Sequence, residues 1–519
     1  MDQDMPSDNT IDRITSDSLN LFGSEVIIQE VTEEPEIPDD QALIQEESDE
    51  IQFKEEPDLQ ENSESASHPY LAIGIQLIRD HEWIKALPYL SKVIDSDEEA
   101  PLGWLYLGMI HLHLSNFEQA REYLQKAFSF ERTRSISLYY LAFGEYRKSD
   151  FQKALTYLEQ IPAGDIKNEK KLFLKGLCHF KLRQYQSAIQ EFHELLISDP
   201  DHKRTLFLIA YSQLLSNIPE EALKNDDHLL ELDDRFVHAW ELKSRILIKL
   251  ERYSEALFST KRLLWLKPKA YAGLWISCFS LLKMNRYEEA LNTSRLITTY
   301  YPLHSTGWNL MGLAYMGLNK FQDALKPLER ALQINPHDSA YQAYRIIALR
   351  KLKRYGDLLQ YYEYLTEEEP DNLKAWFNRG VLLHRAGRFL EAIESYQKVL
   401  DKNPADSRAL LNKGRAHQAL HETHKAITLF KQVIHIHPEN SDAWFYLGQI
   451  YTNLVRLAEA IVCFDQVLRI DPRHVKAMIY KAKILNELGK KQQAYQMIHK
   501  AKSLDPDITN QMAGSLVHD

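Results

Sequence analysis

Three histidines, His417, His421 and His424, follow one another at intervals of four and three residues. On one continuous helix this spacing would bring the imidazoles to a single face, where they would be able to bind a metal ion. The helical pattern of the surrounding sequence, however, breaks at residues 420–424, where we expect a turn. We therefore interpret the group as solvent-exposed histidines and predict neither a metal site nor another cofactor.

The motifs of the common enzyme classes are missing from the sequence. It contains no phosphate-binding GxxxxGKS/T or GxGxxG loop, no zinc-binding HExxH and no nucleophilic GxSxG. Its three cysteines, Cys178, Cys278 and Cys463, lie far apart and form no CxxC pair, so no disulfide framework or zinc cluster is indicated. Unpaired cysteines are typical of a reducing compartment, and we expect a cytoplasmic protein without catalytic activity.

Charge divides the sequence into two parts. Residues 1–66 contain 21 acidic and 2 basic side chains, a net charge of −19, whereas residues 67–519 contain 60 basic and 53 acidic side chains, a net charge of +7. The first part is rich in Asp, Glu, Ser, Gln and Pro, so we predict an acidic disordered tail. Neither a secretory signal nor a membrane-spanning segment of about 20 apolar residues is present, so we expect no membrane partner.

The elements that surround these residues repeat from residue 67 onward with a period of 34 residues. A small residue usually opens the pattern, and an alanine follows it after twelve residues, as at Gly74/Ala86, Gly108/Ala120, Ala142/Ala154, Gly176/Ala188, Gly312/Ala324, Gly380/Ala392, Gly414/Ala426 and Gly448/Ala460. In nine units a proline comes twelve residues later still. The register continues without insertion through thirteen units, residues 67–508, and a period of this length indicates a helical repeat array.

One unit shows why the pattern favours paired helices. In residues 441–474, Trp444, Leu447, Gly448 and Tyr451 form an apolar stripe with helical spacing. A second stripe begins at Ala460, and a proline then ends the second helix. Each helical hairpin has one apolar face that it is unable to bury alone, so neighbouring hairpins must stack.

The sequence resembles the tetratricopeptide repeat family. The residues Trp308, Met311, Gly312, Tyr315, Ala324, Leu328, Ala331 and Pro336 nearly restate the family pattern at unit positions 4, 7, 8, 11, 20, 24, 27 and 32. The resemblance implies an all-α, right-handed superhelical solenoid of about thirteen helix-turn-helix repeats over residues 67–508, followed by a short tail, 509–519. Pentatricopeptide repeats, which bind RNA, run one residue longer, so no nucleic-acid partner is expected.

Two units depart from the pattern. Unit 339–372 has Ile346 and Leu358 at the two small positions, and we expect a local kink or hinge there. Unit 135–168 contains Pro162 near its end, so its second helix should stop early.

The family resemblance also implies a binding groove lined by positions 2, 5, 9 and 12 of each unit. In the N-terminal half these positions are apolar and aromatic, whereas in the last three units they are mainly polar. The candidate groove residues are Tyr139, Phe143, Tyr146, Phe173, Phe180, Phe207, Tyr211, Trp275 and Phe279, with Asn378 and Asn412 as possible backbone-binding amides. The alternative is that the aromatic residues pack between neighbouring first helices. No unit has the position-5 lysine with which chaperone-binding members of the family hold a carboxylate.

These features favour a non-catalytic adaptor that binds peptide or protein segments, of unknown identity, in its concave groove. One alternative is a self-regulated protein in which residues 15–60 of the acidic tail occupy the groove. Another is an accessory subunit of an enzyme such as a glycosyltransferase.

Overall fold

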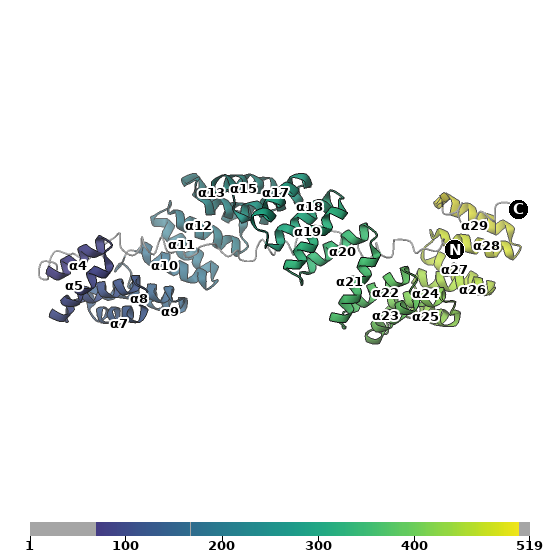
Figure 1. Ribbon diagram of the computed structural model, residues 1–519, viewed down its shortest axis with the longest axis horizontal. Coiled ribbons are helices and arrows are strands. Elements are labelled where there is room, and N and C mark those ends of the chain that lie inside the picture. The colour runs from purple at the N-terminus through teal and green to yellow at the C-terminus, as the bar shows by residue number, and fades with distance from the viewer. Residues whose placement is uncertain (1–68, 167, 508–519) are drawn as a thin grey trace. The chain divides into compact units, whose positions relative to one another are not determined.

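The computed structural model describes residues 69–166 and 168–507, which form α-helices joined by short turns (Figure 1). The predicted tails, residues 1–66 and 509–519, lie outside the described residues. Within the described part there is no β-strand, and no helix is both long and apolar enough to cross a membrane.

The chain divides into two compact bodies, residues 69–342 and 343–507 in the described part. The helices of the first body are α4 (Pro69–Arg79), α5 (Trp83–Ser96), α6 (Pro101–His113), α7 (Phe117–Phe128), the 3-10 helix η1 (Glu131–Thr133), α8 (Arg134–Arg147), α9 (Phe151–Glu159), α10 (Asn168–Lys181), α11 (Tyr185–Ser198), α12 (Lys203–Leu215), α13 (Pro219–Leu232), α14 (Val237–Lys249), α15 (Tyr253–Leu266), α16 (Tyr271–Lys283), α17 (Tyr287–Tyr300), α18 (Ser305–Gly317) and α19 (Phe321–Ile334).

The division falls inside α20 (Ser339–Lys351). The second body continues with α21 (Tyr355–Glu368), α22 (Leu373–Arg385), α23 (Phe389–Lys402), α24 (Ser407–Ala419), α25 (Thr423–Ile436), α26 (Ser441–Asn453), α27 (Leu457–Ile470), α28 (Val475–Glu487) and α29 (Lys491–Leu504). The predicted all-α solenoid of thirteen hairpins is therefore confirmed.

Each even-numbered helix is the first helix of a hairpin, and the odd-numbered helix that follows is the second. The first helices of successive hairpins contact one another, as α14 with α16 and α24 with α26, whereas no comparable contact joins successive second helices of the described part. Because the closer helices lie on the concave side of a curved stack, the row of first helices is called the inner face and the row of second helices the outer face of each body.

The contact inside a hairpin explains the small residue at position 8. A Cβ atom added to Gly448 would lie 2.9 Å from the ring of Phe464, and one added to Gly414 would lie 2.6 Å from the ring of Phe430. The glycine therefore makes room for the large side chain at position 24 of the second helix. At both positions the group packed on the glycine is an aromatic ring rather than the backbone of the second helix.

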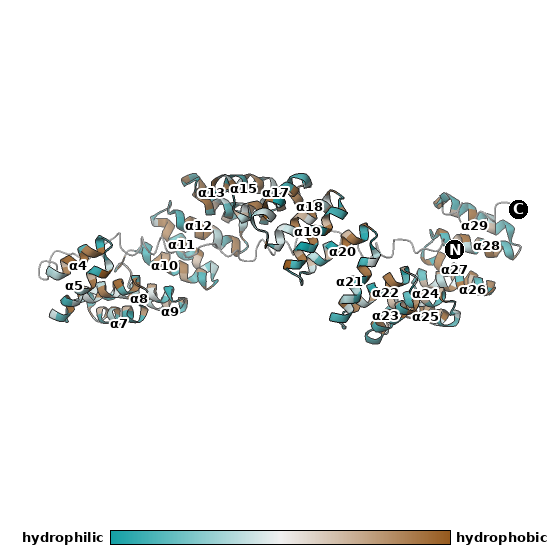
Figure 2. Ribbon diagram, viewed as in Figure 1, coloured by the Kyte–Doolittle hydropathy of each residue, from teal (hydrophilic) through white to brown (hydrophobic). Residues whose placement is uncertain are grey.

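The contact between hairpins explains the tryptophan at position 4. The indole N–H of Trp444 donates a hydrogen bond of 2.9 Å to the carbonyl oxygen of Pro438 at the end of the preceding hairpin. Trp308 and Trp376 donate in the same way to Pro302 and Pro370. Figure 2 shows the result, helices that carry both hydrophobic and hydrophilic residues, as amphipathic packing requires.

The structure tests the prediction for unit 135–168 but not the one for unit 339–372. α9 has only 9 residues, whereas most second helices have 14, and the early end before Pro162 is confirmed. The boundary between the two bodies falls in unit 339–372, the unit with Ile346 and Leu358. The expected kink or hinge in that unit stays a prediction.

Candidate functional site

The aromatic residues predicted to line the groove belong to the first body, and the structure buries them. Each has a side chain exposed by no more than 8%: Tyr139, Phe143, Tyr146, Phe173, Phe180, Phe207, Tyr211, Trp275 and Phe279. An open aromatic groove would require exposed rings, so the expectation of an exposed apolar surface at these residues is wrong.

Some of these rings pack between neighbouring first helices, and others pack against second helices, as Phe173 does against Phe192 of α11. The ring of Phe180 on α10 lies 5.6 Å from that of Tyr211 on α12, and Phe207 lies 5.7 Å from Phe236, which precedes α14. Aromatic pairs at such distances contribute packing energy beyond the area that they bury. The packing alternative that the sequence left open is observed for Phe180 and Tyr211. A role of the nine residues in binding a partner stays a prediction.

The two candidate asparagines are engaged within the second body. The side-chain N–H of Asn378 donates to the Tyr362 hydroxyl at 3.3 Å. Asn412 is buried, donates to the Arg408 carbonyl oxygen at 2.9 Å and accepts from the Arg415 guanidinium at 3.1 Å. Both amides therefore stabilise the array, and their role as a peptide-binding pair stays a prediction.

A row of half-exposed polar and aromatic side chains runs along the inner face of the second body. Position 9 of one hairpin contacts position 6 of the next: the Arg415 guanidinium lies 5.1 Å over the Tyr446 ring, and the Gln449 amide donates to the Tyr480 hydroxyl at 3.0 Å. Lys483 lies 6.0 Å over the same Tyr480 ring. We call Arg415, Tyr446, Gln449, Tyr480 and Lys483 the polar ladder.

The surroundings of the polar ladder are mainly cationic. Arg408 and Lys476 occupy position 2 of the hairpins that contain Arg415 and Lys483, while the intervening hairpin has Asp442 there. The sequence predicted that this face would be polar, but missed the tyrosines at position 6. A sequence signal for these tyrosines does exist. In each case an aromatic residue at position 6 lies 31 residues after a polar residue at position 9 of the preceding unit.

The three histidines do not form a site. His417 is buried, with its Nδ1 against the Glu422 carboxylate, whereas His421 occupies the turn with a φ of 60°. The expectation of exposure is therefore wrong for His417. No group of three or more potential ligands in residues 69–166 and 168–507 is placed to hold a metal ion.

The outer face of the first body carries a cluster of exposed apolar side chains. Phe258 and Trp265 on α15, Leu296 and Tyr300 on α17 and the adjacent Leu303 are between 41% and 74% exposed. We call these five residues the outer aromatic patch. Cations accompany it, since Arg262 lies 5.8 Å over the Trp265 ring and Lys269 lies 5.2 Å over the Tyr300 ring. Large apolar side chains exposed on two successive second helices are candidates for an interaction surface.

Comparisons with known proteins place the chain among repeat proteins. Two family profiles, both described as tetratricopeptide repeat, match it, one at residues 71–130, 344–407 and 411–472 and the other at residues 305–338. No characterised protein sequence matches closely enough to count as a relative.

The solved structures that match the chain include three with low sequence identity. The APC/C hetero-tetramer Cut9-Hcn1 is 16% identical over 86% of this chain and 96% of that chain, with a TM-score of 0.34. MamA is 20% identical over 31% of this chain and 95% of its own, with a TM-score of 0.29. A tetratricopeptide repeat protein from Parabacteroides merdae ATCC 43184 is 16% identical over 48% of this chain and 98% of its own, with a TM-score of 0.36.

Proposed function

The chain belongs to the tetratricopeptide repeat family, and from that premise we propose that it is a non-catalytic scaffold that binds an acidic protein segment along the polar ladder. The observation that carries the proposal is the half-exposed, cationic inner face of the second body. The alternative of an accessory enzyme subunit stays a prediction, because no described residue bears on it.

The ladder offers groups that suit an extended acidic segment. Arg415 and Lys483 supply positive charges, and hydrogen bonds between charged groups are stronger than those between neutral ones. The Gln449 amide is able to donate to a carbonyl and accept from an N–H of the bound backbone. The flanking Tyr446 and Tyr480 rings present flat surfaces for the aliphatic parts of that segment.

The test uses the full chain and three labelled ten-residue peptides, of alternating Glu and Ser, Gln and Ser, or Lys and Ser. We expect fluorescence anisotropy to detect binding of the Glu peptide alone, with weaker binding at high salt, because exposed charges are screened beyond about 8 Å at physiological ionic strength. The double variant Arg415→Glu with Lys483→Glu should bind about tenfold more weakly, equivalent to about 1.4 kcal/mol.

A matched control changes the same net charge elsewhere on the second body. Lys398 and Lys502 are exposed on the second helices α23 and α29, and their replacement by Glu should leave peptide affinity within about twofold of the parent. Equal loss of affinity in both double variants would overturn the ladder as the binding surface. Tighter binding of a single-stranded oligonucleotide than of the Glu peptide would overturn the acidic protein segment as the ligand.

A second candidate function is self-regulation by the acidic N-terminal segment. The observation that favours it is the outer aromatic patch, because residues 15–60 combine negative charge with apolar residues such as Phe22 and Phe53. We propose that these apolar residues cover the patch while Asp and Glu meet Arg262 and Lys269. The buried rings of the inner face make that face a poorer place for such docking than the sequence suggested.

The self-regulation proposal is tested with a peptide of residues 15–60 added to a chain that begins at residue 67. Binding should quench or shift the fluorescence of the exposed Trp265, and Phe258→Asp with Leu303→Asp should abolish it. Ile197→Asp is the control, since Ile197 is 82% exposed on α11, away from the patch residues in sequence. An absence of binding at millimolar peptide and low salt removes self-regulation and leaves the scaffold proposal intact.

A further inference from the structure

Polar bridges join neighbouring hairpins at two junctions of the second body, α23 with α24 and α27 with α28. The Lys413 amino group donates to the Gln397 side chain, and the Lys481 amino group pairs with the Asp465 carboxylate. In each case a lysine at position 7 of a first helix reaches an acceptor at position 25 of the preceding second helix. The first body contains the same arrangement, in which Lys243 pairs with Asp227 at 2.5 Å.

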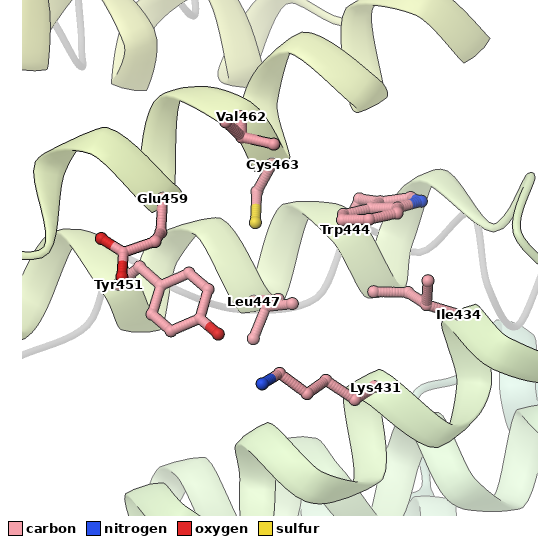
Figure 3. Close-up of a pocket in the computed structure, with 8 residues that line it drawn as sticks. All are labelled: Lys431, Ile434, Trp444, Leu447, Tyr451, Glu459, Val462 and Cys463. Carbon is pink, nitrogen blue, oxygen red and sulfur yellow. The ribbon is translucent and has the colours of Figure 1, made fainter.

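The junction that lies between these two bridged junctions of the second body has no such bridge. Between α25 and α26, position 7 is Leu447 and position 25 is Lys431. A leucine is too short and too apolar to replace the bridging lysine, and the acceptor position itself carries a cation. The bridge seen at the junctions on either side is therefore replaced by a cavity of about 270 Å³ (Figure 3).

The walls of this cavity come from three helices. Its lining consists of Lys431 and Ile434 from α25, Trp444, Leu447 and Tyr451 from α26, and Glu459, Val462 and Cys463 from α27. Figure 3 shows the Lys431 amino group and the Cys463 sulfur directed toward the space around Leu447 from opposite sides. The interior is mainly apolar, with charged groups at its edges.

The wall residues are already held in place by other contacts. The Trp444 indole donates to Pro438, and the Arg456 guanidinium lies 4.7 Å over the Tyr451 ring. Arg456 also pairs with Glu459 at 2.5 Å, so the negative charge of Glu459 is compensated. Burial raises the pKa of the Cys463 thiol to about 12, which leaves an uncharged thiol in the wall at neutral pH. The cavity is thus pre-formed, and its walls need not rearrange to accept an apolar group.

Lys431 is the charged residue of the lining that has no partner of opposite charge among the described residues. Its side chain is exposed and makes no hydrogen bond or ion pair with any residue that the structure describes. The neighbouring junctions supply an amide or carboxylate oxygen to the corresponding lysine. A carboxylate brought by a ligand would complete the same interaction here.

We propose that this cavity binds a large apolar side chain of a partner protein that has an Asp or Glu next to it, with Lys431 holding the carboxylate. Its volume lies just below the range of about 300–1,000 Å³ that is typical of small-molecule sites, so one side chain suits it better than a cofactor. Side chains that anchor a protein interface typically insert into preformed apolar pockets, which the bound partner then closes off from water. None of the residues that line the cavity belongs to the polar ladder, so the proposal does not depend on the ladder.

The test uses methyl NMR spectra of the full chain with labelled Ile, Leu and Val. Ile434, Leu447 and Val462 line the cavity and report directly on its occupation. The probes are capped peptides with the central sequences Phe-Asp, Phe-Asn and Ala-Asp. We expect saturable shifts at these three residues with millimolar Phe-Asp peptide, binding of Phe-Asn that is weaker by up to about fivefold, and no binding of Ala-Asp.

Two variants separate the cavity from the charge. The double variant Leu447→Lys with Lys431→Asp rebuilds the bridge of the neighbouring junctions, so it should fold as the parent does and lose binding of all peptides. Lys431→Gln should still bind both Phe peptides but no longer distinguish Phe-Asp from Phe-Asn. Lys398→Gln, at an exposed lysine of α23, is the control and should behave as the parent does.

Three results would overturn the proposal. They are unchanged binding in the double variant, peptide-induced shifts confined to residues outside the cavity, and an unchanged Phe-Asp preference in Lys431→Gln. Binding of free 4-phenylbutyrate as tightly as the Phe-Asp peptide would assign the cavity to a small carboxylic acid and overturn the partner side chain as its occupant.

Discussion

The inner faces of the two bodies use the same unit positions for different purposes. Phe143 and Tyr211 at position 9 of the first body are buried, whereas Arg415 and Gln449 at position 9 of the second body are half-exposed. An apolar residue on the inner face of a solenoid is therefore able to strengthen the stack rather than to form an open groove. The surfaces proposed for binding are therefore the polar residues of the inner face and the exposed residues of the outer face.

The strongest test of this comparison replaces the residue at position 9 in each body. Phe143→Ala should cost about 3–5 kcal/mol, because it removes a buried aromatic side chain and leaves a cavity. Gln449→Ala should cost about 0.5–1.5 kcal/mol, because it removes one hydrogen bond to Tyr480. Thermal melting and hydrogen exchange of each body measure both effects. Equal, small losses would show that Phe143 is not packed in solution and would restore the open aromatic groove.

The contact inside the hairpin provides a second test. Gly448→Leu should lower the free energy of unfolding of the second body by about 1–3 kcal/mol, because a Cβ at this position would lie 2.9 Å from Phe464 and overpack the contact. The loss should spread to neighbouring hairpins, because each hairpin is stabilised by the next. Gly356→Leu is the control, since no atom lies within 4 Å of a Cβ added to Gly356. An unchanged melting curve for Gly448→Leu would contradict the packing of Phe464 on the glycine.

One hairpin of the first body has an acidic residue at position 24, and there we expect replacement by leucine to stabilise the protein rather than destabilise it. Asp226 at position 24 is fully buried, and neither carboxylate oxygen makes a hydrogen bond within the described residues. Asp226→Leu should stabilise the first body by about 1–3 kcal/mol, because it removes an unsatisfied buried group. Another hairpin shows that leucine fits at this position. There Leu158 is buried at position 24 and position 8 is Ala142, just as position 8 is Ala210 in the hairpin of Asp226.

Asp226 also predicts a pH dependence of stability. Burial, the largest cause, raises the pKa of Asp226 well above its usual value; Lys243 lowers it, and Asp227 raises it. The folded state then binds a proton that the unfolded state releases above about pH 4, so the free energy of unfolding falls as pH rises from about 4 toward the folded-state pKa. Denaturant melts from pH 4 to pH 8 should show this fall in the parent and a smaller one in Asp226→Leu. Identical pH profiles would contradict the assignment to Asp226.

The smallest expected effect concerns the turn within each hairpin. Position 15 adopts a positive φ throughout, with no glycine in the first body but with Gly387 and Gly489 in the second. The second body also places Val455 there with a φ of 58°, a conformation that is costly for a β-branched residue. Val455→Gly should stabilise it by about 1 kcal/mol, and Gly387→Val should destabilise it by a similar amount. Effects of the same sign in the two variants would contradict this reading of the turn.

Local patterns in the sequence were sufficient for the arrangement of the helices. The 34-residue period predicted thirteen hairpins, and Pro162 predicted the short α9. Both predictions succeed because a proline or a periodic apolar stripe determines the limits and the buried face of the helix that contains it. The polar character of the inner face in the last hairpins was also predicted, since each residue's polarity is written in the sequence. The sequence identified the amides of Asn378 and Asn412 as hydrogen-bond donors and acceptors. It did not show that both amides form hydrogen bonds within the array itself.

By itself, the sequence determined the repeat, the helix pairing, the missing catalytic motifs and the −19 charge of residues 1–66. The tertiary structure alone decided which apolar side chains are covered, because the exposure of Phe180 depends on its distance from Tyr211 on another hairpin. It also decided where space remains, because Lys431 and Leu447 leave a cavity only when stacking brings their two helices together. Periodicity describes one helix at a time, whereas exposure and cavities are set by the volumes of side chains that meet across hairpins.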